Sequence, residues 1–192
     1  MIKILDSRIK NFDISLDKIL SKRKAKVQLN TVSVSKIIKD VKRNGDKAIL
    51  KYEKKFNENN VIIPNPQKIN KSIKSLDIKV KKAIDLAYNR IYKFHSLQKF
   101  RNISYIDKLK NKLEYRYIPI ESVAIYVPGS TASYPSSVLM NAIPALVAGV
   151  KRIVMINPSQ KGKQNSAVLY AARKCGIKEI YSIGGPSAIA AA

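Results

Sequence analysis

The chain has 192 residues, a hydrophobic fraction of 45% and a single cysteine, and its formal net charge is +24. Length and composition exclude a disordered chain and a disulfide scaffold. The charge raises nucleic acid as a partner, but 29 of the basic residues are lysines, which are spread along the chain without a nucleic-acid-binding motif. Because isoleucine and asparagine are also abundant, AT-rich codon usage explains the charge better, and we expect no nucleic-acid partner.

No segment of the sequence is predicted to span a membrane. The longest uncharged run, Ser122–Val150, is broken by proline and glycine, and its best apolar piece, Val138–Val150, is shorter than the ~20 residues that a spanning helix needs. The N-terminus lacks the apolar core of a signal peptide. With one cysteine and no targeting signal, we expect a cytoplasmic protein.

The first part of the chain has apolar residues at helical spacing. A helix pair is predicted at about 33–56, with Gly45 able to end the first helix and Asp46 able to cap the second. Residues 57–67 are typical of a connector, and a long amphipathic helix is predicted at about 75–97.

In the second part of the chain the spacing of the apolar residues is no longer helical. A continuous apolar run at 123–127 is typical of a strand that is covered on both faces, and further strands are predicted at 153–156 and 180–183. Helical segments at 138–149 and 166–175 lie between them, and the strands recur at nearly the ~30-residue spacing of a βαβ unit. Three parallel strands in one sheet are therefore expected.

Together these patterns predict an α/β protein with two domains. Residues 1–112 form a helical N-terminal region, and residues 113–192 form an incomplete Rossmann-like domain with a parallel βαβαβ sheet. The last residues, 188–192, resemble the beginning of a helix, so we expect a truncated chain.

Two loops follow predicted strands at the sheet edge where open parallel sheets bind ligands. They are Pro128–Ser137 and Gly184–Gly185. Neither contains the G-x-G-x-x-G fingerprint of dinucleotide binding, so a simple tight turn remains an alternative for both.

The residues that could carry chemistry are few. His95 is the only histidine, Cys175 the only cysteine, and Glu179 the only acidic residue after Glu121. Zinc needs three or four such ligands, and no serine triad or carboxylate pair can be assembled. We expect no catalytic residue and no metal ligand in this chain.

Several segments resemble the N-terminal part of the histidinol dehydrogenase family. The most specific is Tyr126–Ala132, which reads Y-V-P-G-S-T-A and precedes P-S-S-V-L-M; it is similar to the family signature Y-[IV]-P-G-G-[TS]-A-x(3)-S-[ST]-V-L-M. Three further segments are also similar to the family and occur in the same order along the chain as in the family: 41–56, 94–98 and 169–191.

The resemblance implies an NAD-dependent, zinc-containing homodimer that oxidises L-histidinol through the aldehyde to L-histidine, in histidine biosynthesis. It implies that Tyr126 contacts NAD and that Ser187 takes the place of an NAD-contacting glutamine. Ser130 and Pro186 also depart from the family pattern, which changes the groups that both loops offer to the cofactor.

The family's general-base pair and zinc ligands correspond to positions beyond residue 192. The resemblance therefore implies a part of a cofactor-binding domain that is inactive alone. Two alternatives stay open: a non-catalytic subunit that works beside a separately encoded C-terminal part, and, less favoured, a basic nucleic-acid-binding protein.

Overall fold

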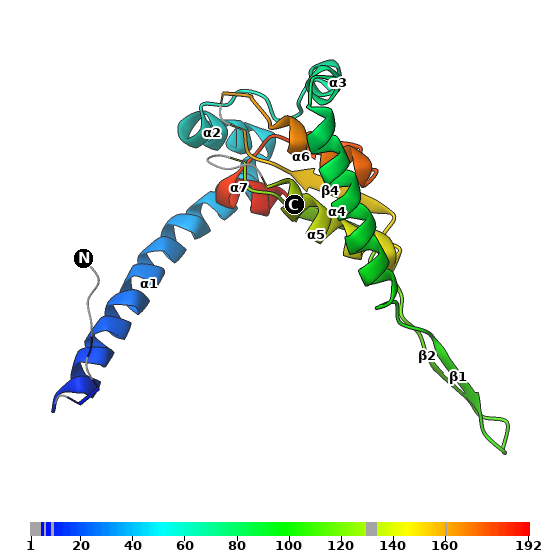
Figure 1. Cartoon of the computed structure of the whole chain (residues 1–192). Helices are drawn as coiled ribbons and strands as arrows, with labels where there is room; N and C mark the ends of the chain where they lie inside the picture. The colour runs from blue at the N-terminus through cyan, green and yellow to red at the C-terminus, as the bar shows by residue number, and fades with distance from the viewer. Residues whose placement is uncertain (1–4, 6, 9, 130–133, 160) are drawn as a thin grey trace.

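The structure is a computed structural model that describes residues 5, 7–8, 10–129, 134–159 and 161–192, without the side chains of 22–30. Twelve elements occur in the described residues, in the order α1 (Phe12–Asn44), α2 (Asp46–Asn57), α3 (Pro66–Lys74), α4 (Ile78–Ser96), β1 (Ile103–Ile106), β2 (Lys112–Tyr115), β3 (Ser122–Tyr126), α5 (Pro135–Ala148), β4 (Arg152–Ile156), α6 (Ser166–Lys174), β5 (Glu179–Tyr181) and α7 (Gly185–Ala191). Figure 1 shows the sheet and its helices in the body of the molecule, from which α1 and the β1–β2 hairpin extend in different directions.

Strands β3, β4 and β5 form a three-stranded parallel sheet in that order. Ala124 lies opposite Val154, and Met155 lies opposite Ile180. The predicted α/β class with a parallel Rossmann-like sheet is confirmed. Continuous apolar runs form these strands because helices cover both faces and leave no face for polar side chains.

The two faces of the sheet pack against different helices. Ile125, Met155 and Ile180 lie in one hydrophobic core with residues of α3, α4, α5 and α6. The alternate residues of the strands, among them Ile156, lie in a second core with residues of α1, α2 and α7. Successive side chains of a strand point to opposite faces, so each strand contributes to both cores.

Asparagine and aspartate side chains cap the N-termini of three helices. The Asn65 side chain accepts a hydrogen bond from the Gln67 N–H at the start of α3, and the Asp77 side chain accepts one from the Lys79 N–H at the start of α4. Asn165 caps α6 in the same way. These side chains satisfy backbone donors that would otherwise lack a partner at a helix N-terminus.

Three details of the N-terminal region differ from the predicted elements. The first helix of the pair predicted at about 33–56 already begins at Phe12, and α3 begins inside the predicted connector 57–67 and extends to Lys74. The predicted helical region 1–112 also contains strand β1, which pairs antiparallel with β2 in an exposed hairpin. The second helix of the pair and the long helix predicted at about 75–97 are present as α2 and α4.

The predicted division at residue 112 stays a prediction. Ile73 and Ile84, from the first region, are buried in the same hydrophobic core as Met155 of the sheet. In the part of the chain that the structure describes, no helix combines the length and apolar character needed to cross a membrane.

Candidate functional site

The loops that follow the three parallel strands meet at the carboxyl edge of the sheet. Asn157, after β4, donates its side-chain Nδ2 to the Val127 carbonyl oxygen at 2.9 Å and its backbone N–H to the Tyr181 carbonyl oxygen at 2.9 Å. Ser159 and Ser182 share a hydrogen bond between their buried hydroxyls. Buried side chains of the β4 loop therefore tie it to the loops on either side.

Two glycines allow these loops to approach each other closely. A Cβ atom on Gly184 would lie 2.8 Å from Pro158 Cγ and 2.9 Å from Pro158 Cβ. A Cβ atom on Gly129 would overlap the Pro158 carbonyl oxygen and lie 2.7 Å from Asn157 Nδ2. Real Cβ atoms do not approach other atoms so closely. Both loops must therefore present bare backbone towards the β4 loop.

The structure brings both predicted cofactor-binding residues to the same loop. The Gly185 N–H donates to the Tyr126 hydroxyl at 3.2 Å, and the Ser187 hydroxyl donates to the Gly184 carbonyl oxygen at 3.0 Å. Tyr126 is partly buried, whereas Ser187 is fully buried at the start of α7. Their roles towards a cofactor stay predictions. Ser130 lies outside the described residues.

Gly185 has a second role in this loop. Its φ is +65°, in the left-handed region, and a Cβ atom there would meet nothing within 4 Å. Glycine is therefore favoured at 185 by its backbone conformation, but at 184, where φ is −146°, only by lack of space.

Two side chains from the N-terminal region complete the site, and neither was predicted. Glu53 of α2 is 1% exposed, and its Oε1 accepts the Gly184 N–H at 2.7 Å. Asn59, also 1% exposed, donates its Nδ2 to the Ser182 carbonyl oxygen at 2.6 Å. The available signal was the position of Glu53 on the helical stripe of Ile49 and Tyr52, where a charged residue is unexpected.

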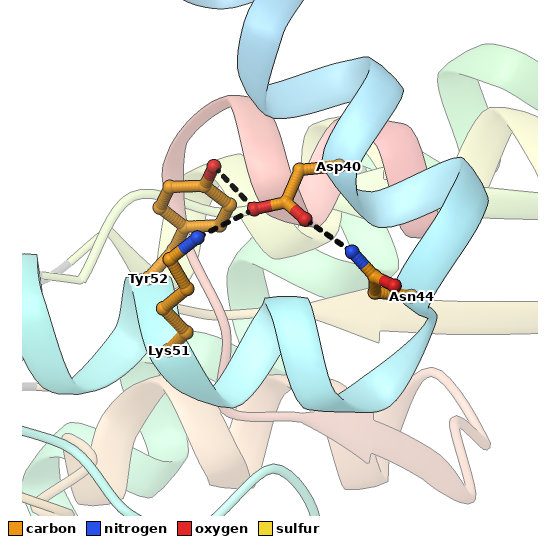
Figure 2. Close-up of polar contacts among 4 residues, drawn as sticks. All are labelled: Asp40, Asn44, Lys51 and Tyr52. Atoms are coloured by element: carbon orange, nitrogen blue, oxygen red, sulfur yellow. Dashed lines mark hydrogen bonds and ion pairs between the residues drawn. The ribbon is translucent and has the colours of Figure 1, made fainter.

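Helix α2, which carries Glu53, is held to α1 by a polar cluster that Figure 2 shows. The Asp40 carboxylate accepts hydrogen bonds from Lys51 at 2.8 Å, from Asn44 at 2.6 Å and from the Tyr52 hydroxyl at 2.8 Å. The hydrogen bond from Lys51, followed by those from Asn44 and Tyr52, holds the pKa of Asp40 well below its usual range. Asp40 therefore stays ionised and anchors α2 against α1.

The remaining candidate residues lie elsewhere and make structural contacts. His95 pairs through Nδ1 with Gln98 at 2.6 Å, and the Glu179 carboxylate accepts two hydrogen bonds from Arg152. Cys175 is buried, and burial raises the pKa of its thiol to about 11. Among the described residues, no group of three or more histidine, cysteine or acidic side chains is placed to hold a metal ion.

Two cavities border the sheet. One of about 490 Å³ is lined by Ser182 and Lys161 among others, but by neither of the two predicted cofactor-binding residues. Another of about 300 Å³ runs along the strands, since its lining includes Arg152 at the amino end of β4 and both Ile156 and Tyr181 at the carboxyl ends of β4 and β5. Ligands of open parallel sheets bind at the carboxyl edge.

A parallel sheet with helices on both faces and glycine loops gathered at its carboxyl edge defines an α/β protein of the Rossmann-like class. The sequence model of histidinol dehydrogenase matches residues 20–192, and the chain belongs to this family.

Individual histidinol dehydrogenases are also similar in sequence to this chain. The chain is 81% identical over 191 residues to the histidinol dehydrogenase of Pelagibacter ubique (strain HTCC1062), a match that covers 100% of this chain and 45% of the relative. It is 44% identical over 175 residues to that of Agrobacterium fabrum, which covers 89% of this chain and 40% of the relative.

A solved structure is similar as well. The crystal structure of histidinol dehydrogenase from Elizabethkingia anophelis superposes with a TM-score of 0.79 at 35% sequence identity, over 84% of this chain and 38% of that chain. The chain thus spans less than half the length of the curated relatives that it matches.

Proposed function

We propose that this chain is the NAD-binding part of a histidinol dehydrogenase, an oxidoreductase of histidine biosynthesis. The observation that carries the proposal is the loop at Gly184–Gly185, where Tyr126 and Ser187 meet at the carboxyl edge of a parallel sheet. Crowded glycine loops at this edge suit a dinucleotide because its phosphates need close approach to backbone.

In the proposed reaction, L-histidinol is oxidised through the aldehyde to L-histidine by a cytoplasmic homodimer. NAD, when bound, would accept one hydride in each of the two oxidation steps, and residues of this chain would bind and orient it. The Tyr126 hydroxyl lies at 3.2 Å from the Gly185 nitrogen, so it can contact the same group of the cofactor as that loop. Ser187, whose hydroxyl is bonded to the Gly184 carbonyl oxygen, would act mainly by holding the loop.

Zinc, which the family implies, does not fit the described part of this chain. No described cluster offers the three or four ligands that zinc needs, and the Cys175 thiol is buried with a raised pKa. We therefore place the zinc ligands and the general base on the remaining length of the enzyme and expect no turnover by this chain alone.

A calorimetric titration with NAD tests the proposal. The wild-type chain should bind NAD saturably, and Tyr126→Phe should weaken binding about threefold or more because a phenol hydrogen bond is lost. Tyr105→Phe, on the exposed β1–β2 hairpin, is the matched control and should bind as the wild type does. A wild-type chain that binds no NAD, or a Tyr126→Phe variant indistinguishable from it, would contradict the proposed site.

A further inference from the structure

A buried carboxylate reaches the candidate cofactor loop from a helix that is distant in the sequence. Glu53 on α2 is 1% exposed, and its two oxygens have different partners. Oε1 accepts the Gly184 N–H at 2.7 Å, and Oε2 accepts the Asn57 side-chain N–H at 2.9 Å. Both donors are neutral groups, so these two contacts stabilise the carboxylate through hydrogen bonds and not through ion pairs.

The chemistry of this contact makes it directional and strong. A buried carboxylate is costly unless it accepts hydrogen bonds, and a hydrogen bond to an ionised acceptor is shorter and stronger than one between neutral groups. The Gly184 N–H is therefore held from α2, in addition to the contacts that the loop makes with the β4 loop.

The loop needs such an external support. It connects β5, which has three residues, to α7, which has seven, so neither element can fix it by a long hydrogen-bond ladder. Gly184 has no side chain to anchor it, and contact with Pro158 prevents one from being added. The segment after α2 provides a second support, because the Ser182 N–H donates to the Ile62 carbonyl oxygen at 2.6 Å.

The two neighbouring amides of the loop face different partners. The Gly184 N–H is bound by the buried Glu53, whereas the Gly185 N–H is bound by the Tyr126 hydroxyl at an exposed position. A ligand can replace a neutral, exposed phenol more easily than a buried carboxylate. Gly185 is thus the amide that the loop can offer to a ligand.

We propose that Glu53 is a positioning residue of the cofactor site: it anchors the Gly184 amide so that the Gly185 amide and Tyr126 face the cofactor in fixed geometry. The inference rests on the proposed NAD site, which it deepens by assigning the loop's support to α2. Glu53 touches no cofactor itself, because it is fully buried behind the loop.

The test uses Glu53→Gln, Glu53→Ala and the control Glu121→Gln. Glu121 is exposed and directly precedes the amino end of β3, whereas the loop amides follow the carboxyl ends of the strands. Because the chain has 7 glycines, selective ¹⁵N-glycine labelling gives a spectrum simple enough to follow Gly184 and Gly185 individually. NAD affinity is measured by calorimetry on the same samples.

In Glu53→Gln the Gly184 amide proton should move upfield, because its acceptor loses its charge, and the Kd for NAD should rise about threefold or more. Glu53→Ala should show a larger rise, so that glutamine partly rescues binding relative to alanine. Glu121→Gln should leave both readouts unchanged. A merely structural residue would lower the melting temperature without this ordered effect on Gly184 and on the Kd.

An unchanged Gly184 resonance in Glu53→Gln, or a Kd within about twofold of the wild type, would overturn the inference. So would loss of cooperative unfolding in Glu53→Gln, since the residue would then support the whole core rather than one loop. If the wild-type chain binds no NAD, the proposed function fails, while the Gly184 resonance still decides separately whether Glu53 anchors the loop.

Discussion

Gly184→Ala tests the packing of the loop cluster directly. The added Cβ would lie 2.8 and 2.9 Å from two carbons of Pro158 and 3.3 Å from the Asn57 side-chain nitrogen, where ordinary contact begins near 3.4 Å. The backbone at 184 is extended, so the conformation itself costs nothing. The whole effect must come from displacing Pro158 or the loop by about half an ångström.

Pro158 cannot yield easily. Its neighbours Asn157 and Ser159 are buried and hydrogen-bonded to the loops on either side. Overpacking of this kind costs about 1–3 kcal/mol, and in a domain of this size each kcal/mol corresponds to a decrease of about 2–4 °C in Tm. We therefore expect Gly184→Ala to melt at least about 2 °C below the wild type and to bind NAD more weakly.

Differential scanning calorimetry with Gly176→Ala as control measures this effect. Gly176 has φ +72° and nothing within 4 Å of its Cβ position, so alanine there introduces backbone strain of about 1 kcal/mol without a clash. It should lower Tm but leave NAD affinity unchanged, because Gly176 precedes the amino end of β5, whereas the loop cluster follows the carboxyl ends of the strands. A Gly184→Ala variant as stable as the wild type would refute the close packing of Gly184 on Pro158.

Two further predictions concern charge and reactivity. Asp40→Asn should destabilise the chain at neutral pH, and its effect should shrink as the pH falls below about 4. The reason is that the pKa of Asp40 is lowered in the folded state, so the ionised carboxylate stabilises the fold above its unfolded-state pKa and this stabilisation is lost on acidification. Thermal melts of both proteins from neutral to acidic pH measure the difference in Tm, and a difference that does not shrink in acid would contradict the role of the ionised carboxylate. Cys175 should react with an aromatic disulfide reagent only as fast as the chain opens, since its thiol is buried with a pKa of about 11; rapid reaction of the native chain would contradict that burial.

The parallel sheet was predictable because its strands leave a strong local signal. The runs that contain Val123–Val127 and Ile153–Ile156 are apolar without interruption, and each is followed by a proline or asparagine-proline turn. Such runs are compatible with strands covered on both faces and with little else at that length. The site loops were found for the same reason, since glycine and proline mark the strand ends.

The beginning of α1 was missed although its residues carry a helical signal. Phe12, Leu16 and Ile19 recur at spacings of four and three residues, which is typical of a helix. In the structure Leu16 and Ile19 are exposed, and Figure 1 shows this part of α1 extending away from the body of the molecule. The stripe at the start of α1 therefore does not mark a face that is buried in the core of the chain.

Glu53 was missed for a different reason. Its position on an apolar stripe is visible in the sequence, but its partner, the Gly184 amide, is 131 residues away. A backbone donor carries no side-chain identity, so no residue pattern could indicate the pairing. Tertiary contacts between side chains and distant backbone amides lie beyond what local patterns can predict.

We propose that this chain carries the cofactor-binding part of its family's enzyme and does not complete the reaction by itself. The most direct measurement is one sample in two steps: calorimetric titration of the wild-type chain with NAD, followed by addition of L-histidinol and zinc while NADH absorbance is recorded. We expect saturable NAD binding and no formation of NADH. An absence of NAD binding, or steady NADH production by the chain alone, would contradict the proposal.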